Sequence, residues 1–251
     1  MNKYLGLIPF FYFQQTRLNT IKSFVFHSYM EWLSAILILF LLEGFTITNS
    51  VQSFIVGYLI FISIYEIGYI ANDHLSIRKE RNPRKRSVFT NTFQIVLAVS
   101  IRLFFFLFVI YVLDAWYDIR IWVSYSLLVI TFIMHNSIKM MDYRLLSFIN
   151  LAILRYFLPI IIFLDINTIQ LLLPPVLLGY VLFRSFIYAD SKDLLSLING
   201  RTNSFNLFFY LLLTPTLLFI SYLTKSYVPI LAFLYPLPIV ALSFLKTTQS
   251  K

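Results

Sequence analysis

The sequence predicts an all-α protein, a polytopic transmembrane helical bundle. Of the 251 residues, 59% are hydrophobic and only 12% are charged, whereas soluble domains average about 45–50% apolar and about 25% charged residues. The mean hydropathy is +0.80, and the apolar residues gather in stretches close to the roughly 20 residues that a helix needs to cross a bilayer. The chain is therefore expected to be an integral membrane protein whose surroundings are the lipid bilayer.

About eight spans follow from these stretches. Residues 1–25 contain a lysine and a short apolar run but no small-residue cleavage site, which indicates an interfacial segment rather than a signal peptide. Residues 26–245 form the predicted bundle, and residues 246–251 form a polar tail. Prolines fall within several spans, which membrane helices tolerate when neighbours satisfy the freed carbonyl groups. The predicted spans are 26–47, 51–71, 88–113, 119–134, 145–164, 169–189, 205–223 and 227–245.

The connections between the spans differ in their content of Lys and Arg. The links at 48–50, 114–117, 165–167 and 224–226 are short and poor in basic residues. The other side of the bundle carries most of the basic residues, and the positive-inside rule places that side, with both termini, in the cytoplasm. We therefore expect a protein of the bacterial cytoplasmic membrane. The basic positions are the loop 72–87 with Lys3, Arg17, Lys22, Lys139, Arg144, Lys192, Arg201, Lys246 and Lys251.

The composition excludes several kinds of chemistry. The chain has no cysteine, so it has no disulfide, no thiol nucleophile and no cysteine-based zinc site. Its three histidines, His27, His74 and His135, lie far apart without the spacing of a metal-binding helix. The formal charge of +9 is concentrated between apolar blocks. This favours anionic substrates over nucleic acid, because no soluble face is visible to carry a DNA-binding stripe.

The densest polar segment, residues 72–86, directly follows the second predicted span. If the helix continues past the membrane, Asn72, Ser76 and Glu80 lie on one face, with Asp73 beside them. Such a face presents oxygen ligands to Mg²⁺, which binds through few carboxylates plus substrate phosphates. The alternative interpretation is a positive-inside anchor that only holds the loop in the cytoplasm. The cationic donors that would bind a diphosphate are Arg78, Lys79, Arg81, Arg84, Lys85 and Arg86.

A second polar segment follows the sixth predicted span. Asp190 and Asp193, three residues apart on a helix end, share a face that suits a second metal ion. A plain helix terminus with a stop at Gly200 explains the same residues. Charged residues inside spans are costly in a bilayer and are expected to face the bundle interior or to extend toward the interface from helix ends. They are Glu31, Glu43, Glu66, Arg102, Arg155 and Arg184, of which Glu66 and Arg155 are preferred as functional.

The order of these residues resembles a known family. Asn72-Asp73, Ser76, Glu80-Arg81, Pro83 and Lys85-Arg86 are similar to the first Asp-rich motif of the UbiA superfamily of intramembrane prenyltransferases, written NDxxDxxxD. The basic extension is closest to the branch that transfers phosphoribose to polyprenyl phosphate. Ser76 and Leu197 stand where the family has aspartates, and the family usually has nine spans. Further similarities are Asp190 and Asp193 to the second Asp-rich motif, Ser137-Ile138-Lys139 to the YSxxLK stretch, and Arg155 to the helix arginine after it.

The resemblance implies a Mg²⁺-dependent transferase that acts on a polyprenyl (di)phosphate, or that uses phosphoribosyl diphosphate as donor. The alternatives are a catalytically inactive relative that binds a lipid phosphate or a protein partner, and a transporter, for which no repeated halves are evident. The implied metal ligands are Asn72, Glu80, Asp190 and Asp193; the implied catalytic residues are Asp73, Glu80, Asp190 and Asp193; and the implied phosphate-binding residues are Arg81, Arg84, Lys85, Arg86, Lys139 and Arg155.

Overall fold

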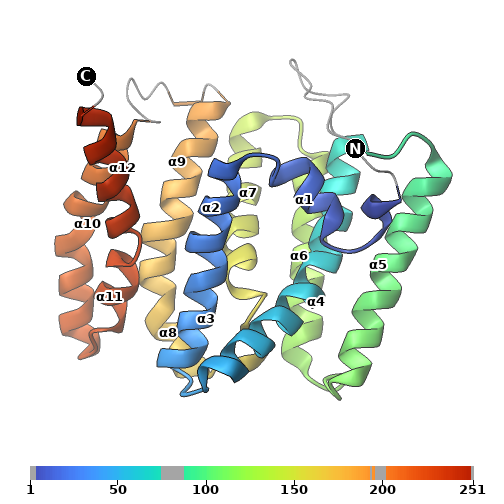
Figure 1. Ribbon diagram of the computed structural model, residues 1–251, viewed down its shortest axis with the longest axis horizontal. Coiled ribbons are helices and arrows are strands. Elements are labelled where there is room, and N and C mark those ends of the chain that lie inside the picture. Colours follow the sequence, from blue (N-terminus) through green and yellow to red (C-terminus); the bar gives the residue numbers. More distant parts are fainter. Residues whose placement is uncertain (1–3, 75–87, 193, 196–201, 250–251) are drawn as a thin grey trace. The chain divides into compact units, whose positions relative to one another are not determined.

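The computed structural model describes residues 4–74, 88–192, 194–195 and 202–249, with side chains through residue 245 (Figure 1). Every regular element in these ranges is a helix, and this confirms the all-α prediction. Seven helices in the described ranges are long and apolar enough to cross a membrane, so the chain is an integral membrane protein. The remaining predicted span, the fifth (145–164), corresponds to α7 (Met141–Phe157), which has 17 residues. The seven are Ile21–Leu41, Ile47–His74, Thr92–Val112, Ile119–Ser137, Ile166–Ser191, Asn203–Thr224 and Val228–Leu245.

The first connection lies a few residues before the predicted link at 48–50. Helix α3 (Ser34–Leu41) ends before Gly44, and α4 (Ile47–His74) begins after Thr46. Gly44 has a φ of +70°, a conformation that glycine adopts readily and that commonly terminates helices. The Thr46 hydroxyl oxygen accepts a hydrogen bond of 3.2 Å from the backbone N–H of Asn49, and this caps α4. The turn is therefore set by Gly44 and Thr46, and residues 48–50 are helical.

The fifth predicted span, 145–164, is interrupted by a proline. Helix α7 ends at Phe157, and a short 3₁₀ turn, η4 (Ile161–Phe163), follows it. Pro159 lacks a backbone N–H, and its ring disfavours the helical conformation at Leu158. The apolar run therefore continues beyond the end of the helix.

Two of the long helices contain a π-helical segment, a form that is rare and often found at functional sites. The helix Ile21–Leu41 consists of α2 (Ile21–His27), the π segment η2 (Ser28–Leu33) and α3. The helix Ile166–Ser191 consists of α8 (Ile166–Pro175), the π segment η5 (Val176–Val181) and α9 (Leu182–Ser191). The second π segment directly follows two prolines, and the first carries the buried Glu31.

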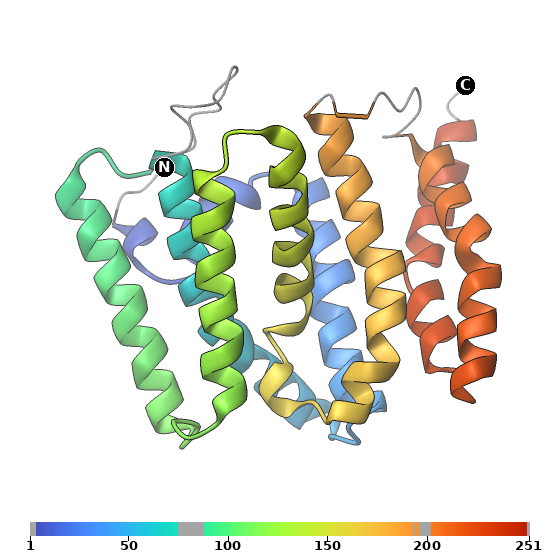
Figure 2. The ribbon, with the colours of Figure 1, turned by 180° about the vertical axis from the view of Figure 1, so that it is seen from behind.

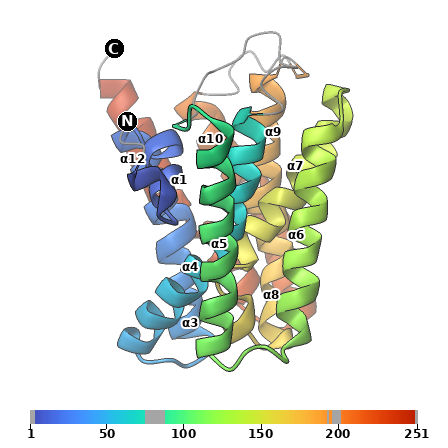
Figure 3. The ribbon, with the colours of Figure 1, turned by 90° about the vertical axis from the view of Figure 1, so that its right-hand side faces the viewer.

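The chain divides into two compact units, and the first comprises residues 1–139 and 154–163. Helix α4 is its central element, because it packs against α3, α5 (Thr92–Val112) and α6 (Ile119–Ser137). The N-terminal segment, defined as residues 4–17, contains η1 (Leu5–Leu7) and α1 (Phe11–Arg17), which contact α5 and α4 (Figures 1 and 3). Tyr12 and Phe13 of this segment are 0% and 1% exposed, so the segment is part of the core of the unit.

The second unit comprises residues 140–153 and 164–251. Helices α10 (Asn203–Thr224), α11 (Val228–Leu234) and α12 (Leu237–Gln249) pack together, and α11 also contacts α8 and η5 (Figure 2). The hydroxyl of Tyr210 donates a hydrogen bond of 3.0 Å to the carbonyl of Gly179, which ties α10 to the π segment. The core of this unit contains Phe183, Phe209, Tyr210, Leu217, Ile230 and Phe233.

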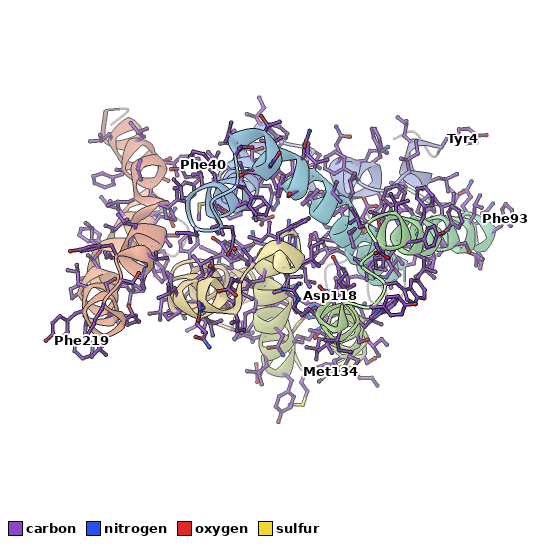
Figure 4. All side chains as sticks on the ribbon, turned by 90° about the horizontal axis from the view of Figure 1, so that it is seen from below. Tyr4, Phe40, Phe93, Asp118, Met134 and Phe219 are labelled. Atoms are coloured by element: carbon purple, nitrogen blue, oxygen red, sulfur yellow. The ribbon has the colours of Figure 1, made fainter. Side chains whose placement is uncertain are left out.

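Large apolar side chains also cover the outside of both units. Phe93 and Met134 of the first unit are 73% and 52% exposed, and Phe219 of the second is 61% exposed (Figure 4). On a soluble protein such a surface would be an aggregation liability. On long apolar helices it is the surface that lipid tails cover.

Candidate functional site

Helix α4 presents three polar side chains, Glu66, Tyr69 and Asp73, to the N-terminal segment. Their spacing of three and four residues places them on one face of the helix. Glu66 and Asp73 are 0% and 5% exposed. Since a buried carboxylate is costly unless it is paired, the partners of this face determine what it can do.

Asp73 is held by two residues of α1. The hydroxyl of Tyr12 donates to Asp73 Oδ2 at 2.9 Å, and the Arg17 guanidinium pairs with Oδ1 at 2.8 Å. The Arg17 guanidinium also lies over the ring of Tyr69, 4.5 Å from its centroid. Burial, followed by the nearby charge of Asp73, raises the pKa of Tyr12, so the hydroxyl stays protonated and remains a donor. Both carboxylate oxygens of Asp73 are therefore engaged.

Glu66 forms a buried ion pair with Arg102 of α5. The shortest distance, from Arg102 Nη2 to Glu66 Oε2, is 2.7 Å, and both side chains are 0% exposed. Glu66 also accepts hydrogen bonds from the backbone N–H groups of Phe10, at 3.0 Å, and Phe13, at 2.6 Å. Together the two side chains satisfy backbone groups at the end of η1 and the start of α1 that lack helical partners, which burial within the bundle requires. Arg102 donates to the carbonyl oxygens of Gly6, Leu7, Ile8 and Ala98.

A second buried ion pair joins the first π segment to α7. The Arg155 Nε lies 3.0 Å from both carboxylate oxygens of Glu31. Arg155 also donates to the Tyr69 hydroxyl at 2.7 Å, and its Nη2 lies 3.2 Å from His27 Nδ1. The side chains of Arg155 and Glu31 are 5% and 7% exposed. Glu31, Glu66, Arg102 and Arg155 thus face the interior of the first unit, as their cost in lipid predicts.

An apolar cavity of about 500 Å³ opens beside the N-terminal segment. The segment, the first π segment, α4 and α5 all contribute to its walls. Two polar groups of the lining, Trp32 Nε1 and the Tyr58 hydroxyl, are buried without a hydrogen-bond partner. The lining residues are Ile8, Pro9, Phe10, Phe11, Trp32, Phe54, Ile55, Tyr58, Leu59 and Phe105.

The described residues include about half of the predicted site. Asn72 lies half-exposed in the last turn of α4, next to the buried Asp73, and Lys139 is exposed after α6. Asp190 is half-exposed in the last turn of α9, in the second unit. Among the described residues no group of three His, Cys, Asp or Glu side chains gathers around one point. The remaining predicted site residues lie outside the described ranges: Glu80, Arg81, Arg84, Lys85, Arg86 and Asp193.

Sequence reasoning did not identify the partners that hold Asp73 and Glu66. Tyr12 precedes the predicted spans, and Arg17 was only one basic residue among several outside them. A signal exists in retrospect: Tyr12 and Thr16 are spaced at i and i+4, and Thr16 Oγ1 donates to the Tyr12 carbonyl at 2.7 Å. Both side chains are buried, at 0% and 5% exposure, so this helical face points inward.

No family model matches the chain, and neither does any curated protein or solved structure. The resemblance to the UbiA superfamily therefore stays a prediction that rests on the motif residues.

Proposed function

We propose that the chain is a UbiA-like intramembrane transferase that acts on a polyprenyl (di)phosphate or on phosphoribosyl diphosphate with a polyprenyl phosphate. The observation that carries the proposal is the last turn of α4. There Asp73 is locked by Tyr12 and Arg17, while Asn72 beside it stays half-exposed at the end of a membrane-spanning helix. Asn72 is therefore accessible to a substrate or a metal ion, and this supports the proposal.

The proposal gives different tasks to the neighbouring residues. Amide and carboxylate oxygens fit Mg²⁺, and the residues that would hold it are Asn72, Glu80, Asp190 and Asp193. When bound, Mg²⁺ would neutralise charge on the departing diphosphate. Asp73 has both oxygens engaged, so its task is to fix the end of α4 against α1. Phosphate oxygens are bound by Arg81, Arg84, Lys85, Arg86 and Lys139. Arg155, which the resemblance adds to this set, is buried against Glu31, so its task here is to hold the bundle together.

The balance of charge favours a lipid phosphate as acceptor. In this reaction the bond between the ribose carbon and the diphosphate breaks, a bond from that carbon to a lipid-phosphate oxygen forms, and diphosphate leaves. Two anionic phosphorylated substrates then meet at one membrane surface, and they need more cationic contacts than prenyl transfer to a neutral acceptor. The loop 72–87 carries six such residues, Arg78, Lys79, Arg81, Arg84, Lys85 and Arg86.

We expect label to enter the lipid fraction when purified protein is given radiolabelled phosphoribosyl diphosphate, polyprenyl phosphate and Mg²⁺. Asp190→Asn should reduce this incorporation by at least about tenfold, because a lost metal ligand weakens the site. The matched control is Asp118→Asn, since Asp118 caps α6 and is not among the proposed site residues.

The same protein should be given prenyl diphosphate with aromatic acceptors. Product only in that mixture would replace the phosphoribosyl proposal with prenyl transfer. Product in neither mixture would favour the non-catalytic alternative, a protein that binds a lipid phosphate or a protein partner.

The proposal places the loop 72–87 and both termini in the cytoplasm. Because the chain has no cysteine, single cysteines can be labelled without background. A cysteine at Arg84 should resist a membrane-impermeant maleimide in intact cells and react after permeabilisation. A cysteine at Tyr117, which is 90% exposed, should react in intact cells. The reverse pattern would invert the proposed orientation.

A further inference from the structure

The apolar cavity of the first unit has exposed as well as buried lining residues. Two of its lining residues, Ile8 and Ile55, are each 49% exposed, whereas Phe54 and Tyr58 on the same wall of α4 are 7% and 8% exposed. Ile55 lies within the membrane-spanning helix Ile47–His74. An occupant that passes between Ile8 and Ile55 therefore comes from the bilayer and not from water. The volume of about 500 Å³ falls in the range of small-molecule sites, about 300–1,000 Å³.

The cavity is not purely apolar in its chemistry. The Tyr58 hydroxyl and Trp32 Nε1 are both buried without a hydrogen-bond partner, and both residues line the cavity. Leaving a buried donor unpaired is unfavourable. Both are donors, so an occupant with an accepting oxygen would satisfy them, whereas a plain hydrocarbon would not.

The N-terminal segment contributes a residue with a strained backbone, Phe10, to the wall of the cavity. Phe10 has a φ of +78° and a ψ of −37°, a region that residues with side chains rarely adopt and that recurs at ligand clamps. Glu66 holds this conformation by accepting the Phe10 N–H. As a result the ring of Phe10 lies with its centroid 6.2 Å from those of both Trp32 and Tyr58. The strained residue thus packs beside the two rings that carry the unpaired donors.

We propose that this cavity binds an apolar chain from the bilayer that carries a hydrogen-bond-accepting oxygen. The chain enters between Ile8 and Ile55, its apolar part lies against Phe54 and Leu59, and its oxygen accepts from Trp32 Nε1 and the Tyr58 hydroxyl. The site does not depend on the transferase proposal, because none of its lining residues belongs to the predicted phosphate or metal site.

The first test uses Trp32 as its own reporter. A variant with Trp116→Phe and Trp122→Phe keeps Trp32 as the single tryptophan of the three in the chain. It is placed in liposomes of phosphatidylcholine with brominated chains, which quench tryptophan on contact. We expect Trp32 quenching to fall at least threefold when Leu59→Phe fills the cavity. Leu127→Phe is the matched control, because Leu127 of α6 is 50% exposed, and it should leave quenching unchanged. Equal quenching in all three proteins would mean that Trp32 contacts lipid only at the protein surface. That result would overturn the proposed binding site.

The second test asks whether the occupant needs a hydrogen-bond-accepting oxygen, and it leaves the lining of the cavity unchanged. Dodecan-1-ol and dodecane are added separately to displace the brominated chains from Trp32. We expect the alcohol to act at about fivefold lower membrane concentration, the ratio that one net hydrogen bond produces. Tyr58→Phe, which keeps the shape of the ring, should reduce this ratio. Equal potency of the two probes in the parent protein would overturn the hydrogen-bonding part of the proposal.

Discussion

Replacing Arg102 with Met is expected to release the N-terminal segment from the first unit. The substitution removes the partner of Glu66, whose side chain is 0% exposed, and breaking a buried pair from one side costs about 3–5 kcal/mol. It also removes the donor to the backbone carbonyls of Gly6, Leu7 and Ile8. Both losses fall on the same segment, so local release should precede unfolding of the bundle.

Cysteine labelling measures this release directly. Thr16 is 5% exposed, so a cysteine at this position should react slowly with maleimide in the parent protein and at least tenfold faster with Arg102→Met. The matched control is Arg120→Met, which breaks the pair of Arg120 with Asp118, whose side chains are 49% and 23% exposed respectively. Such exposed pairs contribute about 0–1 kcal/mol. Unchanged labelling in Arg102→Met would mean that apolar packing of Tyr12 and Phe13 alone holds the segment.

A double variant separates the cost of leaving Glu66 charged and unpaired from the net stabilisation that the ion pair provides. Glu66→Gln combined with Arg102→Met leaves no buried charge, so it should label more slowly than Arg102→Met alone. Full recovery is not expected, because the amide of Gln offers one accepting oxygen where Glu66 accepts from both Phe10 and Phe13.

The approximate number and the order of the apolar helices could be predicted because a membrane span is a local property of composition and length. The ends of the helices were less predictable. Helix α2 begins at Ile21, before the predicted start at Phe26, because Thr20 accepts a hydrogen bond from the N–H of Ser23 at 3.1 Å. Residues such as Lys22 and Ser23 lower the apolar signal of this first turn without preventing helix formation.

The inward orientation of the charged residues was predictable, but their pairing was not. The cost of a charge in lipid requires Glu31, Glu66, Arg102 and Arg155 to face the interior. Glu66 and Arg102 are 36 residues apart, and Glu31 and Arg155 are 124 residues apart. No periodicity within one helix links residues at such separations, so only the packing of the unit determines the partners. The same holds for Asp73 and Arg17, which are 56 residues apart.

For the candidate site, too, the positions of the polar residues were predictable and their partners were not. The motif placed Asn72 and Asp73 near the end of a span, and both lie in the last described turn of α4, which extends to His74. The engagement of both Asp73 oxygens depends on Tyr12 and Arg17, from a segment for which the sequence indicated only an interfacial position. Local spacing thus located the polar residues, whereas tertiary contacts decided which of them remain accessible.

Replacing Gly57 with Ala is expected to destabilise the first unit by at least about 1–3 kcal/mol, the range for overpacking a core. An added Cβ would lie 2.0 Å from the carbonyl oxygen of Pro159 and 3.0 Å from its carbonyl carbon. Both atoms are backbone, in a turn that Pro159 stiffens, so rotating a side chain cannot relieve the contact. In an ordinary helix interior the same change would stabilise by about 0.5–1 kcal/mol. Overpacking therefore predicts a loss of stability for Gly57→Ala, whereas helix propensity alone predicts a gain.

Gly179→Ala is the matched control for this prediction. Gly179 is also a buried glycine in a helical segment, but its nearest obstacle is a side-chain atom, Phe233 Cδ2, at 3.0 Å. Because a ring can shift by a few tenths of an ångström where a backbone carbonyl cannot, the loss should be smaller than for Gly57→Ala. The midpoint of thermal unfolding in detergent, measured for both variants and the parent protein, provides the comparison. A midpoint for Gly57→Ala at or above that of the parent would mean that α4 and the turn at Pro159 are farther apart than described here.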